Sequence, residues 1–131
     1  MSLFNFFGND DNKGTASSKM EWNKLGHIDQ IDNMIIPQSW ENPVLIFKHS
    51  TRCSISRFAL KQFENEFNLG GKVKPYFLDL LVHRNISNEI AFRFNVQHQS
   101  PQVLLIKNGV CIYNVSHQDI EAEKLNVLIS N

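Results

Sequence analysis

The hydrophobic positions of this chain fall into short blocks, and their spacing alternates between that of strands and that of helices. A short first strand is predicted around Trp22 and Leu25, and the apolar positions of residues 27–34 then recur at helical spacing. Pro37 and Pro43 are expected to break the chain after this helix, because proline removes a backbone donor and restricts the residue before it.

The middle of the chain predicts a central strand that leads directly into a long helix. Residues 44–49 form a short, mostly apolar run with β-branched and aromatic residues, typical of a strand covered on both faces. A helix is predicted from residue 54 to about residue 67, and Gly70–Gly71 supplies its stop. Its inward positions are predicted to be Ile55, Phe58, Ala59, Leu60, Phe63 and Phe67.

A further strand and helix follow this unit. Residues 76–81 read as a strand, and Asn85 or Ser87 is expected to cap the helix after it. The apolar positions predicted to face inward from this helix are Ile86, Ile90 and Phe94.

The last third of the chain predicts a hairpin and a final helix. Asn108–Gly109 is a strong signal for a tight turn between strands at 102–107 and 110–115. The final helix is expected to begin near Ser116 or His117. Its predicted inward positions are Ile120, Leu125 and Leu128.

The predicted order of elements is β-α-β-α-β-α-β-β-α. Its β-α-β units require parallel strands, and the closing hairpin adds an antiparallel pair. The order therefore predicts an α/β protein with a thioredoxin-like fold, in which a small mixed central sheet is flanked by helices on both faces. This domain would occupy residues 21–131. Residues 1–20, in which three phenylalanines near the start are followed by a polar stretch, are predicted to form a disordered tail.

The charge balance narrows the possible partners. The 131 residues include 13 basic and 13 acidic side chains, so no net field favours nucleic acid or an anionic membrane. The longest apolar runs are far shorter than the roughly 20 residues of a spanning helix, and the N-terminus lacks a secretory-signal pattern. These features predict a cytoplasmic protein with neither nucleic-acid nor membrane partners, and they leave its oligomeric state open.

One of the two cysteines, Cys53, lies where the predicted central strand ends and the next helix begins. The unpaired N–H groups and partial positive charge of a helix start stabilise a thiolate, which is the nucleophilic form of cysteine. Lys48, His49 and Arg52 add positive charge or hydrogen-bond donors nearby. These features predict a reactive cysteine; the alternative is an ordinary helix-start residue.

Ser56 stands three positions after Cys53, where a C-x-x-C protein has its second cysteine. Cys53 could therefore attack a disulfide but could not resolve the product internally, so an outside thiol would have to free it. The other cysteine, Cys111, follows a strand predicted to run away from Cys53 for roughly 17 Å. A disulfide requires Cα atoms within about 7 Å, so the two thiols are predicted not to pair within one molecule.

Ser100 and Pro101 precede the predicted strand at 102–107. In thioredoxin-like proteins a cis proline at this place faces the active cysteine, and X-Pro is the bond that readily becomes cis. The Ser100 backbone would then offer an edge on which an extended substrate could pair. The five histidines show no metal-ligand spacing, so neither a metal nor a bound cofactor is predicted.

Three separated blocks of the chain resemble the YtxJ-type monothiol bacilliredoxins. These blocks are residues 47–56, 99–103 and 107–117, and the resemblance as a whole covers about residues 22–130. It implies a thioredoxin fold and the removal of bacillithiol from protein mixed disulfides. The partners would be S-thiolated client proteins, and a low-molecular-weight thiol would be the co-substrate.

The resemblance also implies roles for individual residues. Cys53 would be the attacking cysteine, Ser56 would occupy the resolving position, and Pro101 would be the cis proline, with Lys48 and His49 ahead of the cysteine as in the motif. The family usually has proline directly after the cysteine, where this chain has Ser54. A proline there is preorganised for a helix start, so Ser54 is expected to leave the turn looser.

Two other functions remain open at this point. A thioredoxin-fold interaction module would hold client proteins without turnover, and Ser54 mildly favours it. A peroxidase is the other, because Ser50-x-x-Cys53 matches a peroxiredoxin spacing, although Ile46 stands where that pattern has proline.

Overall fold

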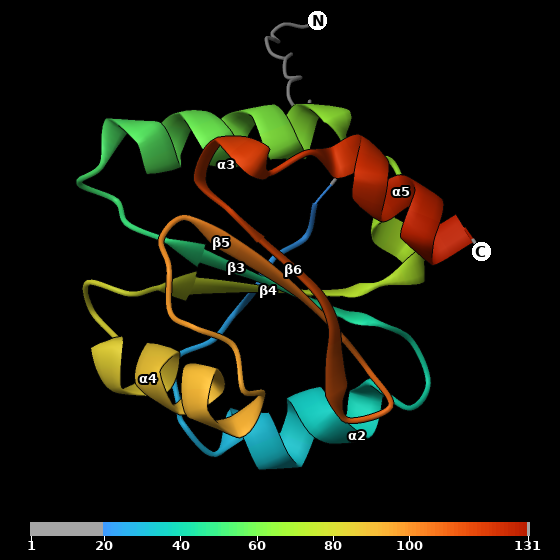
Figure 1. Ribbon diagram of the computed structural model, residues 1–131. Coiled ribbons are helices and arrows are strands. Elements are labelled where there is room, and N and C mark those ends of the chain that lie inside the picture. Colours follow the sequence, from blue (N-terminus) through green and yellow to red (C-terminus); the bar gives the residue numbers. More distant parts are fainter. Residues whose placement is uncertain (1–19, 131) are drawn as a thin grey trace, which may run out of the picture.

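The computed structural model describes residues 20–130, which build a five-stranded mixed sheet between two layers of helices (Figure 1). The strand order across the sheet is β2-β4-β3-β5-β6. The strands are β2 (Asn23–Lys24), β3 (Val44–His49), β4 (Lys74–Asp79), β5 (Gln102–Lys107) and β6 (Val110–Ser116). The α-helices are α2 (Ile36–Gln38), α3 (Ser54–Glu66), α4 (Arg84–Arg93) and α5 (Ala122–Ser130). A π-helical turn (Ile31–Ile35) and two short 3-10 segments (Gly70–Lys72 and His117–Asp119) complete the set.

The pairing of the strands determines which loops share an edge of the sheet. β2, β4 and β3 run parallel, whereas β5 is antiparallel to β3 and β6 is antiparallel to β5. Lys48 near the end of β3 lies opposite Gln102 at the start of β5. The loop that leaves β3 and the loop that enters β5 therefore meet at the same edge.

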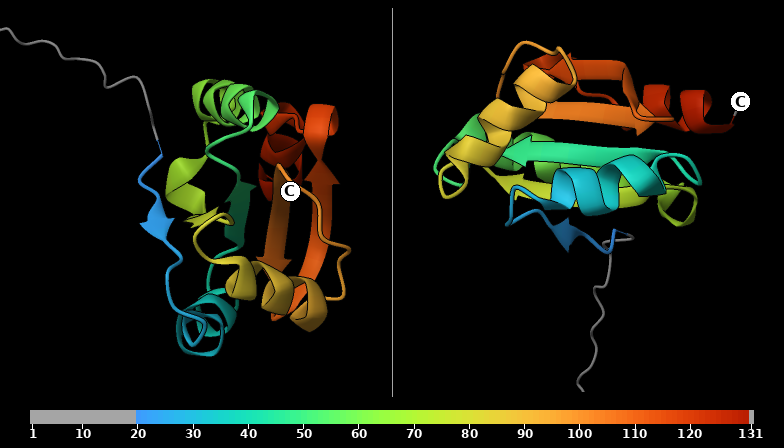
Figure 2. Two further views of the ribbon diagram at one scale, coloured as in Figure 1. Left: turned by 90° about the vertical axis from the view of Figure 1, so that its left-hand side faces the viewer. Right: turned by 90° about the horizontal axis from the view of Figure 1, so that it is seen from below.

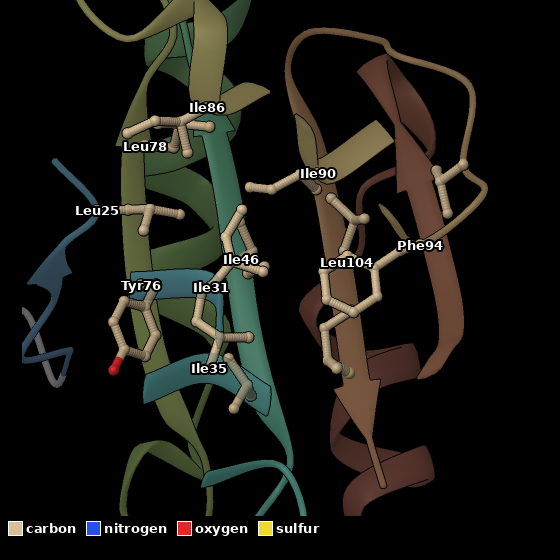
Figure 3. Close-up of a cluster of buried hydrophobic side chains, with 13 residues drawn as sticks. Leu25, Ile31, Ile35, Ile46, Tyr76, Leu78, Ile86, Ile90, Phe94 and Leu104 are labelled. Atoms are coloured by element: carbon tan, nitrogen blue, oxygen red, sulfur yellow. The ribbon is translucent and has the colours of Figure 1, made fainter. Parts of the chain in front are cut away.

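The central strand β3 separates two hydrophobic cores, and all six of its residues are buried. Val44 and Ile46 face the layer of α2 and α4, while Leu45 and Phe47 face the layer of α3 and α5 (Figures 1 and 2). Figure 3 shows the first core, in which residues from the π-helical turn and α4 pack on the sheet. A strand covered on both faces is the reason why this run is apolar rather than alternating.

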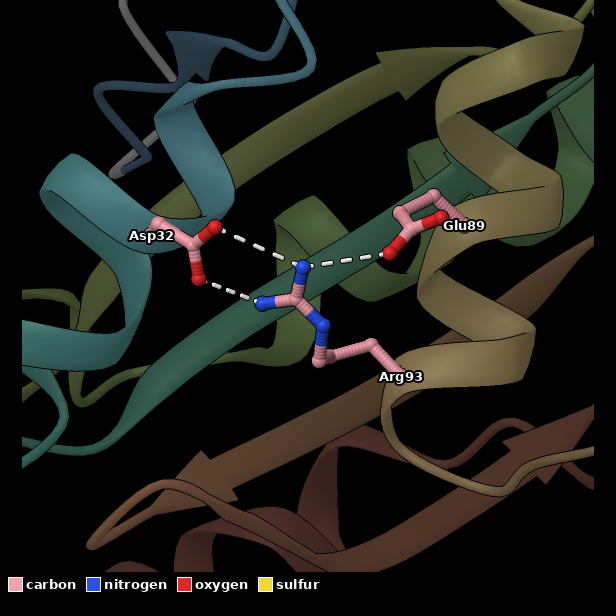
Figure 4. Close-up of polar contacts among 3 residues, drawn as sticks. All are labelled: Asp32, Glu89 and Arg93. Carbon is pink, nitrogen blue, oxygen red and sulfur yellow. Dashed lines mark hydrogen bonds and ion pairs between the residues drawn. The ribbon is translucent and has the colours of Figure 1, made fainter.

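Arg93 at the end of α4 forms an ion pair with Asp32 in the π-helical turn and another with Glu89 one turn earlier (Figure 4). The pairs connect the two helical elements of the same layer. All three side chains are partly exposed to solvent, so each pair is expected to contribute at most about 1 kcal/mol.

The order of elements confirms the thioredoxin-like prediction, and the hairpin is confirmed in detail. β5 covers residues 102–107 as predicted, and β6 extends one residue beyond the predicted end. Asn108 and Gly109 both have positive φ, at 52° and 80°, as a tight hairpin turn requires.

Some element boundaries differ from the prediction. Pro37 lies in the first turn of α2 instead of ending the helix, because the N–H that it lacks needs no partner there. The predicted helix at 27–34 corresponds to the π-helical turn, which begins at Ile31 and continues into α2. α3 ends at Glu66, before the glycines, and β4 begins two residues earlier than predicted.

The predicted caps and inward faces were also wrong in part. α4 starts at Arg84 after His83, so neither Asn85 nor Ser87 is its cap. A 3-10 segment takes the place of the predicted start of the last helix, which begins only at Ala122. The predicted inward residues Ile55, Phe58 and Leu128 are exposed, because helices lying on a sheet bury only a narrow stripe.

The predicted tail lies almost wholly outside the described residues. Its last residue, Met20, is described and is buried in the core beneath α3 and α5. No helix in the described part of the chain is long and apolar enough to cross a membrane.

Candidate active site

Cys53 stands directly before α3, with extended backbone angles (φ −101°, ψ 123°). Its N–H donates to the Ser50 carbonyl (3.1 Å), and its own carbonyl accepts the first helical bond from the Arg57 N–H (3.0 Å). The side chain is half-buried. Cys53 is therefore the residue that flanks the start of α3, where unpaired N–H groups and the helix dipole favour an anion.

His49, the last residue of β3, connects the strand to α3. Its Nδ1 lies 2.7 Å from the Ser56 hydroxyl, and its ring packs against Phe47 and Phe77. Burial lowers the pKa of His49, and the Asp79 carboxylate opposes part of this effect. A lowered pKa favours the neutral ring near pH 7, so of the positive charge or hydrogen bonding predicted from sequence, His49 contributes the hydrogen bond.

Ser56 is completely buried in the first turns of α3. Besides its bond to His49, its hydroxyl accepts the Ser50 N–H at 3.0 Å. The position of the missing second thiol is thus occupied by a hydroxyl with two hydrogen-bond partners.

Lys48 points to the opposite face of the sheet and is also completely buried. Its ammonium donates to the Ser87 carbonyl of α4 (3.1 Å) and lies 3.3 Å from Nδ1 of His98, which in turn is 3.0 Å from the Ser87 hydroxyl. Burial lowers the pKa of Lys48 to about 8. Lys48 therefore connects β3 with α4 and with the loop before β5, instead of adding charge on the α3 side where Cys53 lies.

The remaining predicted residues around the cysteine are on the surface. Arg52 and Ser54 are exposed, with Ser54 as the first residue of α3. Arg57, which the sequence did not single out, donates to the Thr51 carbonyl (3.0 Å) and so holds the exposed part of the loop.

Ser100 and Pro101 lie at the same edge of the sheet, joined by a cis peptide bond as predicted. The loop before them is held from β5, where Gln102 donates to the Gln97 carbonyl (3.0 Å) and accepts the Gln99 N–H (3.4 Å). The Ser100 hydroxyl is buried and makes no hydrogen bond within the described chain.

Sequence reasoning missed three polar residues that hold this loop: Ser87, His98 and Gln102. They come from a helix, a loop and a strand that are far apart along the chain, and each alone is an ordinary polar residue. A signal was present only in Gln102, a polar residue at the head of an apolar strand.

Cys111 lies at the other end of the sheet, as predicted. It is opposite Ile106, which is itself opposite Val44 at the start of β3, whereas Cys53 follows the end of that strand. Its thiol donates to the Tyr113 carbonyl (3.3 Å), and burial raises its pKa. Both cysteines are free thiols.

The described residues contain no group of three or more His, Cys, Asp or Glu side chains placed to hold a metal ion.

A cysteine at the start of the helix after the central strand, beside a loop that ends in a cis proline, defines the class of thioredoxin-fold thiol–disulfide oxidoreductases. Within this class the chain belongs to the monothiol bacilliredoxin family, whose family model matches residues 23–125. The match includes Cys53, Ser56 and Pro101.

Comparison with solved structures agrees with this assignment. A candidate oxidoreductase with a thioredoxin fold is 36% identical, with a TM-score of 0.68 over 79% of this chain and 89% of the other. The thioredoxin of Malassezia sympodialis is 21% identical (TM-score 0.63, covering 86% and 91%), and that of Fasciola hepatica is 17% identical (TM-score 0.60, covering 82% and 96%). The two thioredoxins establish the fold alone.

Proposed function

We propose that this protein removes bacillithiol, or a similar low-molecular-weight thiol, from protein mixed disulfides, with Cys53 as the nucleophile. The observation that carries the proposal is the placement of the thiols. Cys53 flanks the start of α3, Ser56 replaces a second thiol, and Cys111 lies at the opposite edge of the sheet. A single attacking thiol with no resolving partner suits the transfer of a small thiol cap.

The proposed reaction has two thiol–disulfide exchanges. In the first, the Cys53 thiolate attacks the sulfur of the cap, the bond between cap and client breaks, and the client cysteine leaves as a thiolate that takes up a proton. In the second, the thiolate of a free small thiol attacks the cap on Cys53. This step releases Cys53 and a symmetric disulfide of the small thiol, so no other oxidant or reductant is consumed.

The co-substrate and the compartment belong to the same proposal. Since Cys53 has no internal partner, a free low-molecular-weight thiol has to complete each cycle, and no bound cofactor takes part. We place the protein in the cytoplasm, where such thiols are kept reduced.

The test is transfer of the cap, measured by intact-mass spectrometry. Reduced protein is mixed with a bacillithiol-capped client and, in parallel, with a glutathione-capped client. The expected result is a bacillithiol adduct on the protein that forms faster than the glutathione adduct. Cys53→Ser is expected to abolish transfer, and the matched control Cys111→Ser is expected to retain it. If neither adduct forms although Cys53 is reduced and accessible, the proposal is contradicted.

The surface beside Cys53 favours a second candidate, an interaction module without turnover. On α3 the side chains of Ile55 and Phe58 are 52% and 71% exposed, so client proteins could bind there through apolar contacts. The same experiment separates the two functions. A module would retain the client itself, whereas an enzyme would retain only the cap and release the client.

A further inference from the structure

The Ser56 side chain is the point at which three segments of the site are joined. Its hydroxyl accepts the Ser50 N–H (3.0 Å) and bonds Nδ1 of His49 (2.7 Å), and it is completely buried. One oxygen on α3 thus holds the last residue of β3 and the first residue of the loop that carries Cys53.

Two hydrogen bonds to Ser50 hold the loop between β3 and α3. Ser56 holds Ser50 at its beginning, and the Ser50 carbonyl in turn accepts the N–H of Cys53. A substitution at residue 56 would therefore alter the position of Ser50, and through it the hydrogen bond that holds the Cys53 backbone. It would also remove the hydrogen-bond partner of the partly buried Ser50 N–H and of the buried His49 ring, and a buried polar group left without a partner is destabilising.

We propose that Ser56 and His49 are positioning residues that fix the Cys53 loop for attack, and that position 56 is not merely the empty place of a resolving cysteine. The inference rests on the proposed role of Cys53 as nucleophile, and it concerns the first exchange only. It assigns to the serine of the C-x-x-S sequence a function that a thiol would supply less well.

Cysteine is a poor replacement at this position for a chemical reason. A thiol is a weak donor and a weak acceptor, and its sulfur is larger than a hydroxyl oxygen. Ser56→Cys would restore the spacing of a dithiol protein but would weaken both hydrogen bonds. Ser56→Thr keeps the hydroxyl, and His49→Asn keeps a side-chain group that can bond it.

The experiment measures the rate at which Cys53 reacts with a small aromatic disulfide, 5,5′-dithiobis(2-nitrobenzoate), in a Cys111→Ser background. Loss of unmodified protein is followed by intact mass. Ser56→Ala and Ser56→Cys are both expected to react about 10- to 100-fold more slowly, the range that small misplacements of a reacting group produce. Ser56→Thr and His49→Asn are expected to retain most of the rate of the parent protein, whereas His49→Phe is expected to lose it.

The rates retained by the conservative variants distinguish an effect on positioning from a loss of stability. Stability is measured in parallel by thermal unfolding. If Ser56→Ala does not fold, the comparison of His49→Asn with His49→Phe decides the question. The inference is overturned if Ser56→Cys or His49→Phe reacts as fast as the parent protein, which carries Cys111→Ser alone. Because the probe contains no bacillithiol, a fast reaction without cap transfer would contradict the proposed function and leave this inference standing.

Discussion

Lys48 and His49 follow one another on β3 and serve the two loops of the site separately. Because successive side chains of a strand point to opposite faces, Lys48 reaches α4 and His98, while His49 reaches Ser56. Two polar residues at the end of an apolar strand thus hold the loop before Pro101 on one face and the loop of Cys53 on the other.

The buried lysine predicts a pH dependence of stability. Lys48 has a pKa of about 8 in the fold, against an ordinary value of 10.5. Between these values the unfolded chain keeps a proton that the folded protein has lost, so raising the pH favours the folded state. Below pH 8 the proton is bound in both states and the unfavourable effect of burial is constant.

The free energy of unfolding of the unmodified sequence, relative to that of Lys48→Met, is therefore expected to increase from about pH 8 to about pH 10. Urea denaturation of both proteins across this range measures the difference. If the two stabilities change in parallel with pH, Lys48 is not buried as a titrating ammonium.

Local features of the site could be predicted from sequence, but its buried hydrogen bonds could not. Cys53, Ser56 and Pro101 are each defined by neighbours within a few residues along the chain. The contacts of Lys48 with Ser87 and His98 depend on the packing of three separated elements, for which one sequence holds no signal.

At the scale of elements, α3 carries the site on one face of the sheet. Phe63 and Phe67 anchor it, since both are buried and Phe63 packs against Phe47, with ring centroids 5.7 Å apart. Phe58, on the same helix, is exposed. The sequence predicted one wide apolar face on this helix, but aromatic rings are buried only towards its end farther from Cys53.

This difference predicts contrasting effects of two matched substitutions. Phe63→Ala is expected to lower the free energy of unfolding by about 3–5 kcal/mol, because it leaves a cavity in the core. Phe58→Ala is expected to change it by no more than about 0.5 kcal/mol. Chemical denaturation followed by tryptophan fluorescence measures both. Equal effects of the two substitutions would contradict the burial assigned to α3.

Local residue preferences explain which secondary-structure elements could be predicted from the sequence. The hairpin at Asn108–Gly109 was predicted correctly because the turn requires residues that tolerate positive φ. The helix through Pro37 was missed, since proline is compatible with a first helical turn as well as with a break. The predicted caps of α4 failed because this helix starts without a side-chain cap from the described residues.

At the scale of the whole molecule, the sheet separates the two thiols and brings the two loops together. The antiparallel pairing of β5 with β3 places the residues before β5 beside the residues after β3. The same pairing carries the chain to the opposite edge before the turn that precedes Cys111. The architecture therefore leaves Cys53 without an internal partner, as the proposed monothiol mechanism requires.

The most direct test of this account is to locate the cap after one turnover without free small thiol. The protein is mixed with an equimolar bacillithiol-capped client, digested under non-reducing conditions and analysed by mass spectrometry. We expect one bacillithiol on Cys53, a free thiol at Cys111, and removal of the cap only after free bacillithiol is added. A disulfide between Cys53 and Cys111 within one molecule, or a cap on Cys111 alone, would contradict it.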